Sequence, residues 1–187
     1  MGKIVSLRDY GRQKAARRGF KAWKAMLSGG GSLDEDTVWQ DLPDEFILVL
    51  CEDKQKGRLL IYHLIMGALN LGNGYGFESL PSHQLVPLMD VYFMLIDLAH
   101  FECMRRLGWI EDIPCEDEAI IDLLVETAEG NGPGFIRIPR LAKAHPAYDQ
   151  DMESNDLDRQ VLVRKYAKEA VRVFKARIQD KTSDRGI

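Results

Sequence analysis

Apolar residues recur three and four positions apart along most of this chain, the spacing that places side chains on one face of an α-helix. Short glycine-rich runs separate the periodic stretches. The pattern predicts helices over about residues 12–27, from 41 to an interruption at Gly57, over 58–71 and 85–107, from Pro114 to Gly130, and from about 155 onward. Residues 135–155 are the least regular part, and one short extended piece at 135–138 could not make a sheet. We therefore expect an all-α bundle of about five or six helices.

The stretch from about 85 to 107 is apolar on nearly every side and is predicted to be the longest helix. A helix that is apolar all round belongs in the middle of a fold, so we expect the bundle to form around it. Two helix starts are also predicted. Pro43 would lie in the first turn of the helix that begins at Asp41, and Glu116, Asp117 and Glu118 would occupy the first turn after Pro114.

The first predicted helix is amphipathic and basic. Its apolar face holds Phe20 and Trp23, and its other face is rich in Lys and Arg. Gly19 costs a helix about 1 kcal/mol relative to alanine, so this helix needs a surface on which to fold. The sequence then runs Ser28-Gly29-Gly30-Gly31-Ser32. We expect residues 1–32 to be a basic arm with a glycine-rich linker, and residues 33–187 to be a single helical domain.

The distribution of charge along the chain supports the division into an arm and a body. The net charge of the whole chain is −4, but residues 1–27 carry eight Lys or Arg against one acid. Residues 28–155 carry eight against 23 acids, and residues 156–187 carry nine against five. A basic arm beside an acidic body either binds an anionic partner or folds back onto its own body.

The predicted partner-binding residues all lie on the arm. Phe20 and Trp23 would anchor an apolar contact, while the neighbouring cations would steer the partner and fix its register. These cations are Arg17, Arg18, Lys21 and Lys24. A protein with an acidic surface is the favoured partner. Nucleic acid is possible, because phosphates attract cations and bases stack on aromatic rings. A membrane surface is disfavoured by the acidic body, and a homo-oligomer is possible.

A second candidate site lies on the predicted central helix. Asp90 and Asp97 share one face, and His100 follows Asp97 by one turn. With His63 these residues could form a metal site, although the full ligand set of a di-iron bundle is missing. The alternative is structural: Asp97 accepts a hydrogen bond from His100 or a neighbouring helix, and Asp90 pairs with a base. Glu102 and Arg106, four residues apart, are predicted to form an ion pair.

No catalytic signature is present in the sequence. It contains no Gly-x-Ser-x-Gly, zinc-ligand spacing, P-loop or dinucleotide fingerprint, and no cofactor is expected. Glycines 72, 74 and 76 follow a helix end, so we interpret them as a helix stop. Three isolated cysteines favour a reducing compartment, and Cys51 and Cys103 are expected to be buried. No run is apolar for the roughly 20 residues needed to cross a bilayer, so a cytoplasmic location is expected.

These observations favour a non-catalytic adaptor or regulatory protein that acts through its basic amphipathic arm. Two alternatives remain open. One is a metal-dependent helical-bundle enzyme, and the other is a nucleic-acid- or ribosome-associated accessory protein.

Overall fold

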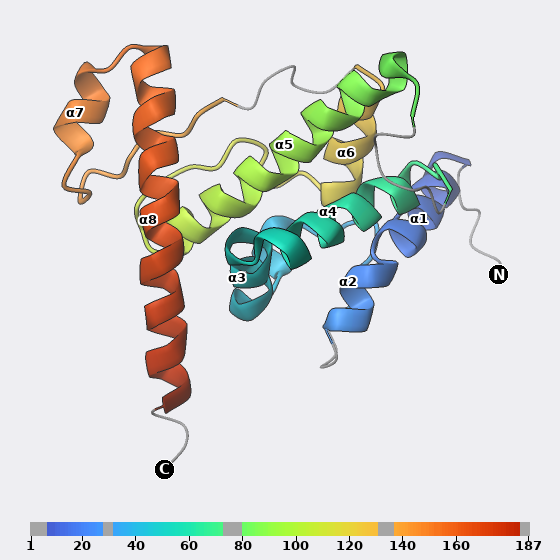
Figure 1. Ribbon diagram of the computed structural model, residues 1–187, viewed down its shortest axis with the longest axis horizontal. Helices are drawn as coiled ribbons and strands as arrows, with labels where there is room; N and C mark the ends of the chain where they lie inside the picture. The colour runs from blue at the N-terminus through green and yellow to red at the C-terminus, as the bar shows by residue number, and fades with distance from the viewer. Residues whose placement is uncertain (1–6, 28–31, 73–79, 131–136, 184–187) are drawn as a thin grey trace, which may run out of the picture.

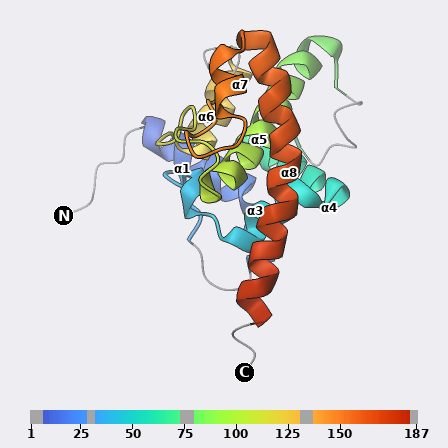
Figure 2. The ribbon, with the colours of Figure 1, turned by 90° about the vertical axis from the view of Figure 1, so that its left-hand side faces the viewer.

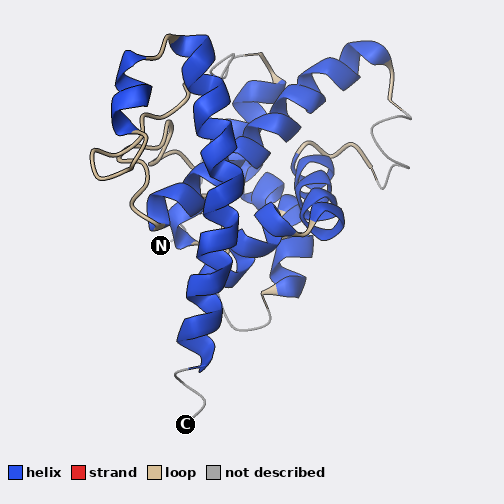
Figure 3. Ribbon diagram, turned by 60° about the vertical axis from the view of Figure 1, so that its left-hand side comes forward, coloured by secondary structure: helices blue, strands red, loops and turns tan. Residues whose placement is uncertain are grey.

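The computed structural model describes residues 7–27, 32–72, 80–130 and 137–183. Within these ranges the chain forms eight α-helices and one 3-10 turn, with no strand (Figure 3). Ile110 and Leu141 form an isolated antiparallel bridge. The predicted all-α class is confirmed.

The N-terminal basic segment is a pair of helices, α1 (Leu7–Gly19) and α2 (Lys21–Met26), where one helix was predicted. The break falls at Phe20, whose ψ of 4° lies outside the helical range. The 3-10 turn η1 (Trp39–Asp41) comes next, followed by α3 (Asp44–Glu52). The helix predicted to start at Asp41 therefore starts three residues later. Pro43 is extended, with ψ 150°, and precedes the first turn.

Helix α4 (Lys54–Ala68) is capped at its N-terminus by Asp53. The carboxylate of Asp53 accepts hydrogen bonds from the backbone amides of Gln55 and Lys56. The predicted interruption at Gly57 is wrong, because Gly57 lies inside α4. A Cβ atom on Gly57 would be 2.5 Å from the carbonyl oxygen of Leu50. This glycine is therefore required for the close approach of α3, and it does not break the helix.

Helix α5 (Ser82–Arg106) has 25 residues, includes Pro87, and packs against α3, α4, α6 and α8. It is not buried on every side, because Val86 is 63% exposed and Phe93 is 56% exposed. It is also not the longest helix, since α8 (Asp156–Ser183) has 28 residues.

The remaining helices are α6 (Ile120–Ala128) and the short α7 (Tyr148–Glu153). Glu116, Asp117 and Glu118 precede α6 and do not form its first turn, which corrects the prediction. Residues 137–140 form no strand, and residues 135–136 lie outside the described ranges, as do 28–31 of the glycine-rich linker.

Figure 1 shows α8 crossing one end of the molecule and α1 and α2 at the opposite end, with α3, α4, α5 and α6 between them. The view in Figure 2 shows the C-terminal end of α8 extending beyond the other helices. One hydrophobic cluster joins the two ends, from Ala15 of α1 to Ile178 of α8. The helices of the basic segment therefore share the core of the body.

Candidate functional site on the N-terminal helix pair

Helix α1 docks on α4 through direct contact between their backbones. A Cβ atom on Gly19 would lie 3.1 Å from both a methyl carbon and the carbonyl oxygen of Leu64. A Cβ atom on Gly67 would lie 2.5 Å from the carbonyl oxygen of Arg18. At 2.5 Å a side chain would overlap the backbone of α1, and at 3.1 Å the atoms of Leu64 would have to shift. These two glycines therefore allow the basic helix to approach the body closely.

Phe20 and Trp23, the predicted partner anchors, are both 0% exposed. The ring centroid of Trp23 lies 5.3 Å from that of Phe20, 6.2 Å from that of Trp39 and 5.0 Å from that of Phe46. The indole Nε1–H donates a 3.0 Å hydrogen bond to the carbonyl oxygen of Leu60 on α4. In the folded chain the two aromatic side chains anchor α2 to its own body, and neither reaches the surface where a partner would bind.

Arg18 is also used internally. Its Nε–H donates to the carbonyl oxygen of Gly67 at 2.9 Å, and its Nη2 donates to that of Ala68 at 3.0 Å. Carbonyls in the last turn of a helix lack partners within the helix and carry partial negative charge. The guanidinium of Arg18 therefore caps the C-terminal end of α4.

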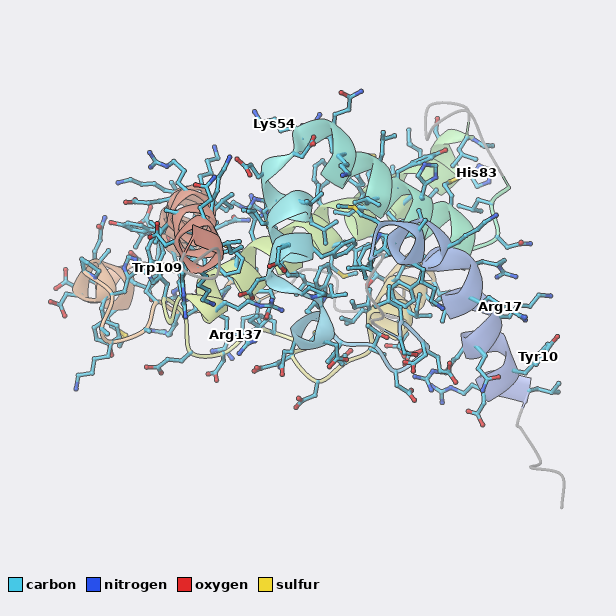
Figure 4. The ribbon with its side chains drawn as sticks, turned by 90° about the horizontal axis from the view of Figure 1, so that it is seen from below. Tyr10, Arg17, Lys54, His83, Trp109 and Arg137 are labelled. Carbon is cyan, nitrogen blue, oxygen red and sulfur yellow. The ribbon has the colours of Figure 1, made fainter. Side chains whose placement is uncertain are left out.

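The other predicted cations remain on the surface. Arg17, Lys21 and Lys24 are exposed, and Lys14 and Tyr10 extend the same side of α1 toward the N-terminus. We call these five residues the outer stripe. Within the described ranges its four cations form no ion pair, and Figure 4 shows Tyr10 and Arg17 on the outer edge of α1. Tyr10 is 55% exposed and was not identified from the sequence.

One cation of α1 binds the acidic body of the same chain. Arg12 donates to both carboxylate oxygens of Asp122 on α6, at 2.8 and 2.6 Å, and to Asp36 at 3.0 Å. The hydrogen bonds and charge of Asp122 raise the pKa of Arg12 above its ordinary value. Part of the basic segment is thus neutralised within the molecule.

Two of the four metal candidates have structural partners on α5 and α8. Asp97 accepts a 3.0 Å hydrogen bond from Arg164 of α8, as the structural alternative predicted. His100 places Nδ1 2.8 Å from the carbonyl oxygen of Ile96, so this nitrogen carries the proton.

The other two metal candidates, His63 and Asp90, are exposed on α4 and α5. His63 packs against Tyr62, with ring centroids 5.5 Å apart. Among the described residues, no group of three or more His, Cys, Asp or Glu could hold a metal ion. The structure therefore does not bring the four candidates together.

The predicted Glu102–Arg106 pair is present and belongs to a buried network. Glu102 is 0% exposed and accepts hydrogen bonds from Arg105 at 2.8 Å and Arg106 at 2.5 Å. Arg106 also donates to Asp44 and to the carbonyl oxygen of Leu42, both at 2.7 Å. Burial opposes ionisation of Asp44, but the hydrogen bond and charge of Arg106 outweigh it and lower its pKa. The network ties α5 to the start of α3 and is structural.

The three cysteines are free. Cys103 is buried as predicted, whereas Cys51, also predicted to be buried, is half-buried, as is Cys115. Burial raises the pKa of Cys103 to about 12 and that of Cys115 to about 11. It also raises the pKa of Cys51 well above its ordinary value. The raised pKa values keep all three side chains protonated at neutral pH.

The irregular segment after residue 137 contains polar side chains that sequence reasoning missed. His145 is 6% exposed, and its ring centroid lies 4.5 Å from that of Tyr166 on α8 and 5.1 Å from that of Trp109. Burial lowers its pKa. Asp151 is 0% exposed and accepts a 3.0 Å hydrogen bond from the amide of Leu141. These contacts hold the segment against α8.

None of the helices in the described ranges has a stretch long and apolar enough to cross a membrane. Comparisons with protein-family models, curated proteins and solved structures find no match for this chain.

Proposed function

We propose that this chain is a non-catalytic adaptor or regulatory protein that binds a protein partner with an acidic surface through the outer stripe. The observation that carries this proposal is that Tyr10, Lys14 and Arg17 share one exposed face of α1, and that Lys21 and Lys24 are exposed on α2, which follows it. No ion pair within the described ranges uses these cations. Phe20 and Trp23 are buried in the body, so the backbone beneath the stripe is already folded before a partner binds. An ordered backbone loses less conformational entropy on binding than a segment that folds on its partner.

Tyr10 replaces Trp23 as the proposed apolar anchor. Exposed tyrosines are enriched among the residues that dominate binding energy at protein interfaces. Exposed cations around such a residue mainly speed association and reject partners of the wrong charge. The stripe therefore has the composition of an interface for an acidic protein.

Two observations favour a protein over a nucleic acid as the partner. Single-stranded nucleic acids bind most tightly where successive bases stack on exposed aromatic rings between cations. Phe20 and Trp23, the two rings predicted for this purpose, are inside the core, and the outer stripe has a single exposed ring, that of Tyr10. Acidic side chains also lie close to the basic helix, at Asp36 and Asp122.

The test captures partners from a nuclease-treated native lysate, with three versions of the full chain as bait. The first is unchanged, and the second carries Lys14→Gln, Arg17→Gln and Lys21→Gln. The third, a matched control, carries Lys143→Gln, Lys168→Gln and Arg172→Gln, three exposed cations away from the stripe. We expect a protein that is retained by the unchanged chain and the control but lost by the stripe variant. Equal capture by all three would overturn the proposal.

The captured protein is then purified and its affinity measured with Tyr10→Ala and with Lys14→Gln. We expect Tyr10→Ala to weaken binding by about tenfold or more, because hot-spot residues contribute at least 1–2 kcal/mol. Lys14→Gln should weaken it only a few-fold and mainly through the association rate. Equal small losses would contradict an anchored interface. Capture that occurs in an untreated lysate but is lost from the nuclease-treated one would support the nucleic-acid alternative.

A further inference from the structure

A cleft of about 740 Å³ separates α1 from α6, and the C-terminal end of α4 contributes to its floor. Pockets that hold small molecules commonly measure about 300–1,000 Å³. The floor is apolar and is made by three helices. It consists of Ala15, Ala68, Leu69, Ile121 and Val125.

The two walls of the cleft have opposite charge. Helix α1 contributes Arg8, Arg12 and Arg18, the last of which caps α4, and α6 with the residue after it contributes Asp122, Glu126 and Glu129. The bidentate contact between Arg12 and Asp122 closes the walls at one point. One turn further along each helix, Arg8 and Glu126 form no ion pair with any described residue, and neither does Glu129. Unlike charges thus line the same cleft without neutralising each other.

The glycines inside the helices give a second, independent indication. Packing explains Gly19, Gly57 and Gly67, because a Cβ atom on each would lie 3.1 Å or less from another part of the protein. Gly11 lies in the middle of α1 and lines the cleft, but a Cβ atom there would meet nothing within 4 Å. A glycine at such a position destabilises the helix by about 1 kcal/mol relative to alanine, and no packing contact offsets this loss. Gly11 is itself exposed, so the open space beside its backbone lies at the mouth of the cleft.

We propose that this cleft binds a small zwitterionic ligand of about dipeptide size. The ammonium group of the ligand lies against Glu126 and Glu129, its carboxylate pairs with Arg8, and an aliphatic side chain covers Leu69 and Val125. A simple anion would be repelled by the acidic wall and a simple cation by Arg8, whereas a zwitterion is attracted by both walls. The cleft shares no residue with the outer stripe, so the inference does not depend on the proposed partner.

The first experiment measures binding of leucyl-leucine to the full chain by calorimetry. Two matched probes each lack one charge: N-acetyl-leucyl-leucine has no ammonium, and leucyl-leucinamide has no carboxylate. We expect saturable binding of leucyl-leucine that is about tenfold or more tighter than binding of either blocked probe, because charged hydrogen bonds are the strong ones. No saturable binding at millimolar concentration, or equal binding of all three probes, would overturn the proposal.

Four variants then locate the site. Gly11→Leu fills the cleft and should abolish binding without lowering the melting temperature, since its Cβ has open space. Gln13→Leu is the matched control, because Gln13 is exposed and does not line the cleft. Arg8→Gln should weaken binding of leucyl-leucine but not of leucyl-leucinamide, and Glu126→Gln should spare N-acetyl-leucyl-leucine. Unchanged binding by a folded Gly11→Leu chain would place the ligand elsewhere.

Discussion

The inner and outer sides of the α1–α2 pair differ in almost every physical respect, although one amphipathic sequence produces both. On the inner side Phe20 and Trp23 are fully buried, Arg18 caps α4, and glycines permit backbone contact. On the outer side the cations are exposed and form no ion pair within the described ranges. The inner side therefore stabilises the fold, and the outer side is the surface on which we propose that a partner binds. This difference can be tested by substitutions. Those on the inner side should change the free energy of unfolding strongly, and those on the outer side should change it little.

The largest effect is expected from Trp23→Ala on the inner side. It removes a fully buried ring and leaves the carbonyl oxygen of Leu60 without its donor. We expect the free energy of unfolding, measured in urea, to fall by about 3–5 kcal/mol. If this variant does not fold, Trp23→Phe keeps most of the ring and should cost about 1–3 kcal/mol through the lost hydrogen bond and volume. A loss below about 0.5 kcal/mol from both would mean that α2 does not stabilise the body.

The next largest loss of stability is expected from Gly67→Ala, because its new methyl group would lie 2.5 Å from the backbone of α1. A backbone atom cannot move aside as a flexible side chain can, so the two helices must separate. We expect a loss of about 2–3 kcal/mol in urea unfolding. An alanine that is tolerated here would show that α1 and α4 are not in direct backbone contact.

Arg18→Gln should have an intermediate effect. It removes the charged donor from two carbonyls at the end of α4. We expect a cost of about 1–2 kcal/mol in urea unfolding. Arg17→Gln is the matched control on the outer side, and it should change stability by no more than about 0.5 kcal/mol. Equal effects of the two substitutions would remove the distinction between the sides.

The only gain in stability is expected from Gly11→Ala. The methyl group enters open space, so helix propensity alone should raise stability by about 0.5–1 kcal/mol. A thermal melt beside Gly67→Ala would show opposite shifts for the same chemical change. A destabilised Gly11→Ala chain would mean that the space beside Gly11 is filled in solution.

The sequence predicts the helical class and most of the helices because their apolar periodicity is local. It cannot tell whether the apolar face of a basic helix packs on its own body or on a partner, since Phe20 and Trp23 have the same spacing in both cases. In the sequence Gly19 indicates only a less stable helix, yet in the structure it permits, with Gly67, the close contact between α1 and α4. Arg17 and Arg18 look equivalent in sequence, and only the position of α4 separates their roles.

The cleft and the buried polar groups also escaped prediction. Arg8 and Glu126 are more than a hundred residues apart, so no local pattern places them on facing walls. His145 and Asp151 lie in a segment without helical periodicity, and their burial depends on the position of α8. Such sites come from tertiary packing, which a single sequence does not display.

Amide hydrogen exchange along the full chain tests most directly whether the basic helix pair belongs to the body. Exchange protection reports the free energy of opening of each segment. The account predicts that amides of residues 16–26 exchange as slowly as those of α4, because the same buried contacts hold both. Rapid exchange of residues 16–26 beside slow exchange of α4 would contradict it, and would show that Phe20 and Trp23 leave the core and are available to a partner.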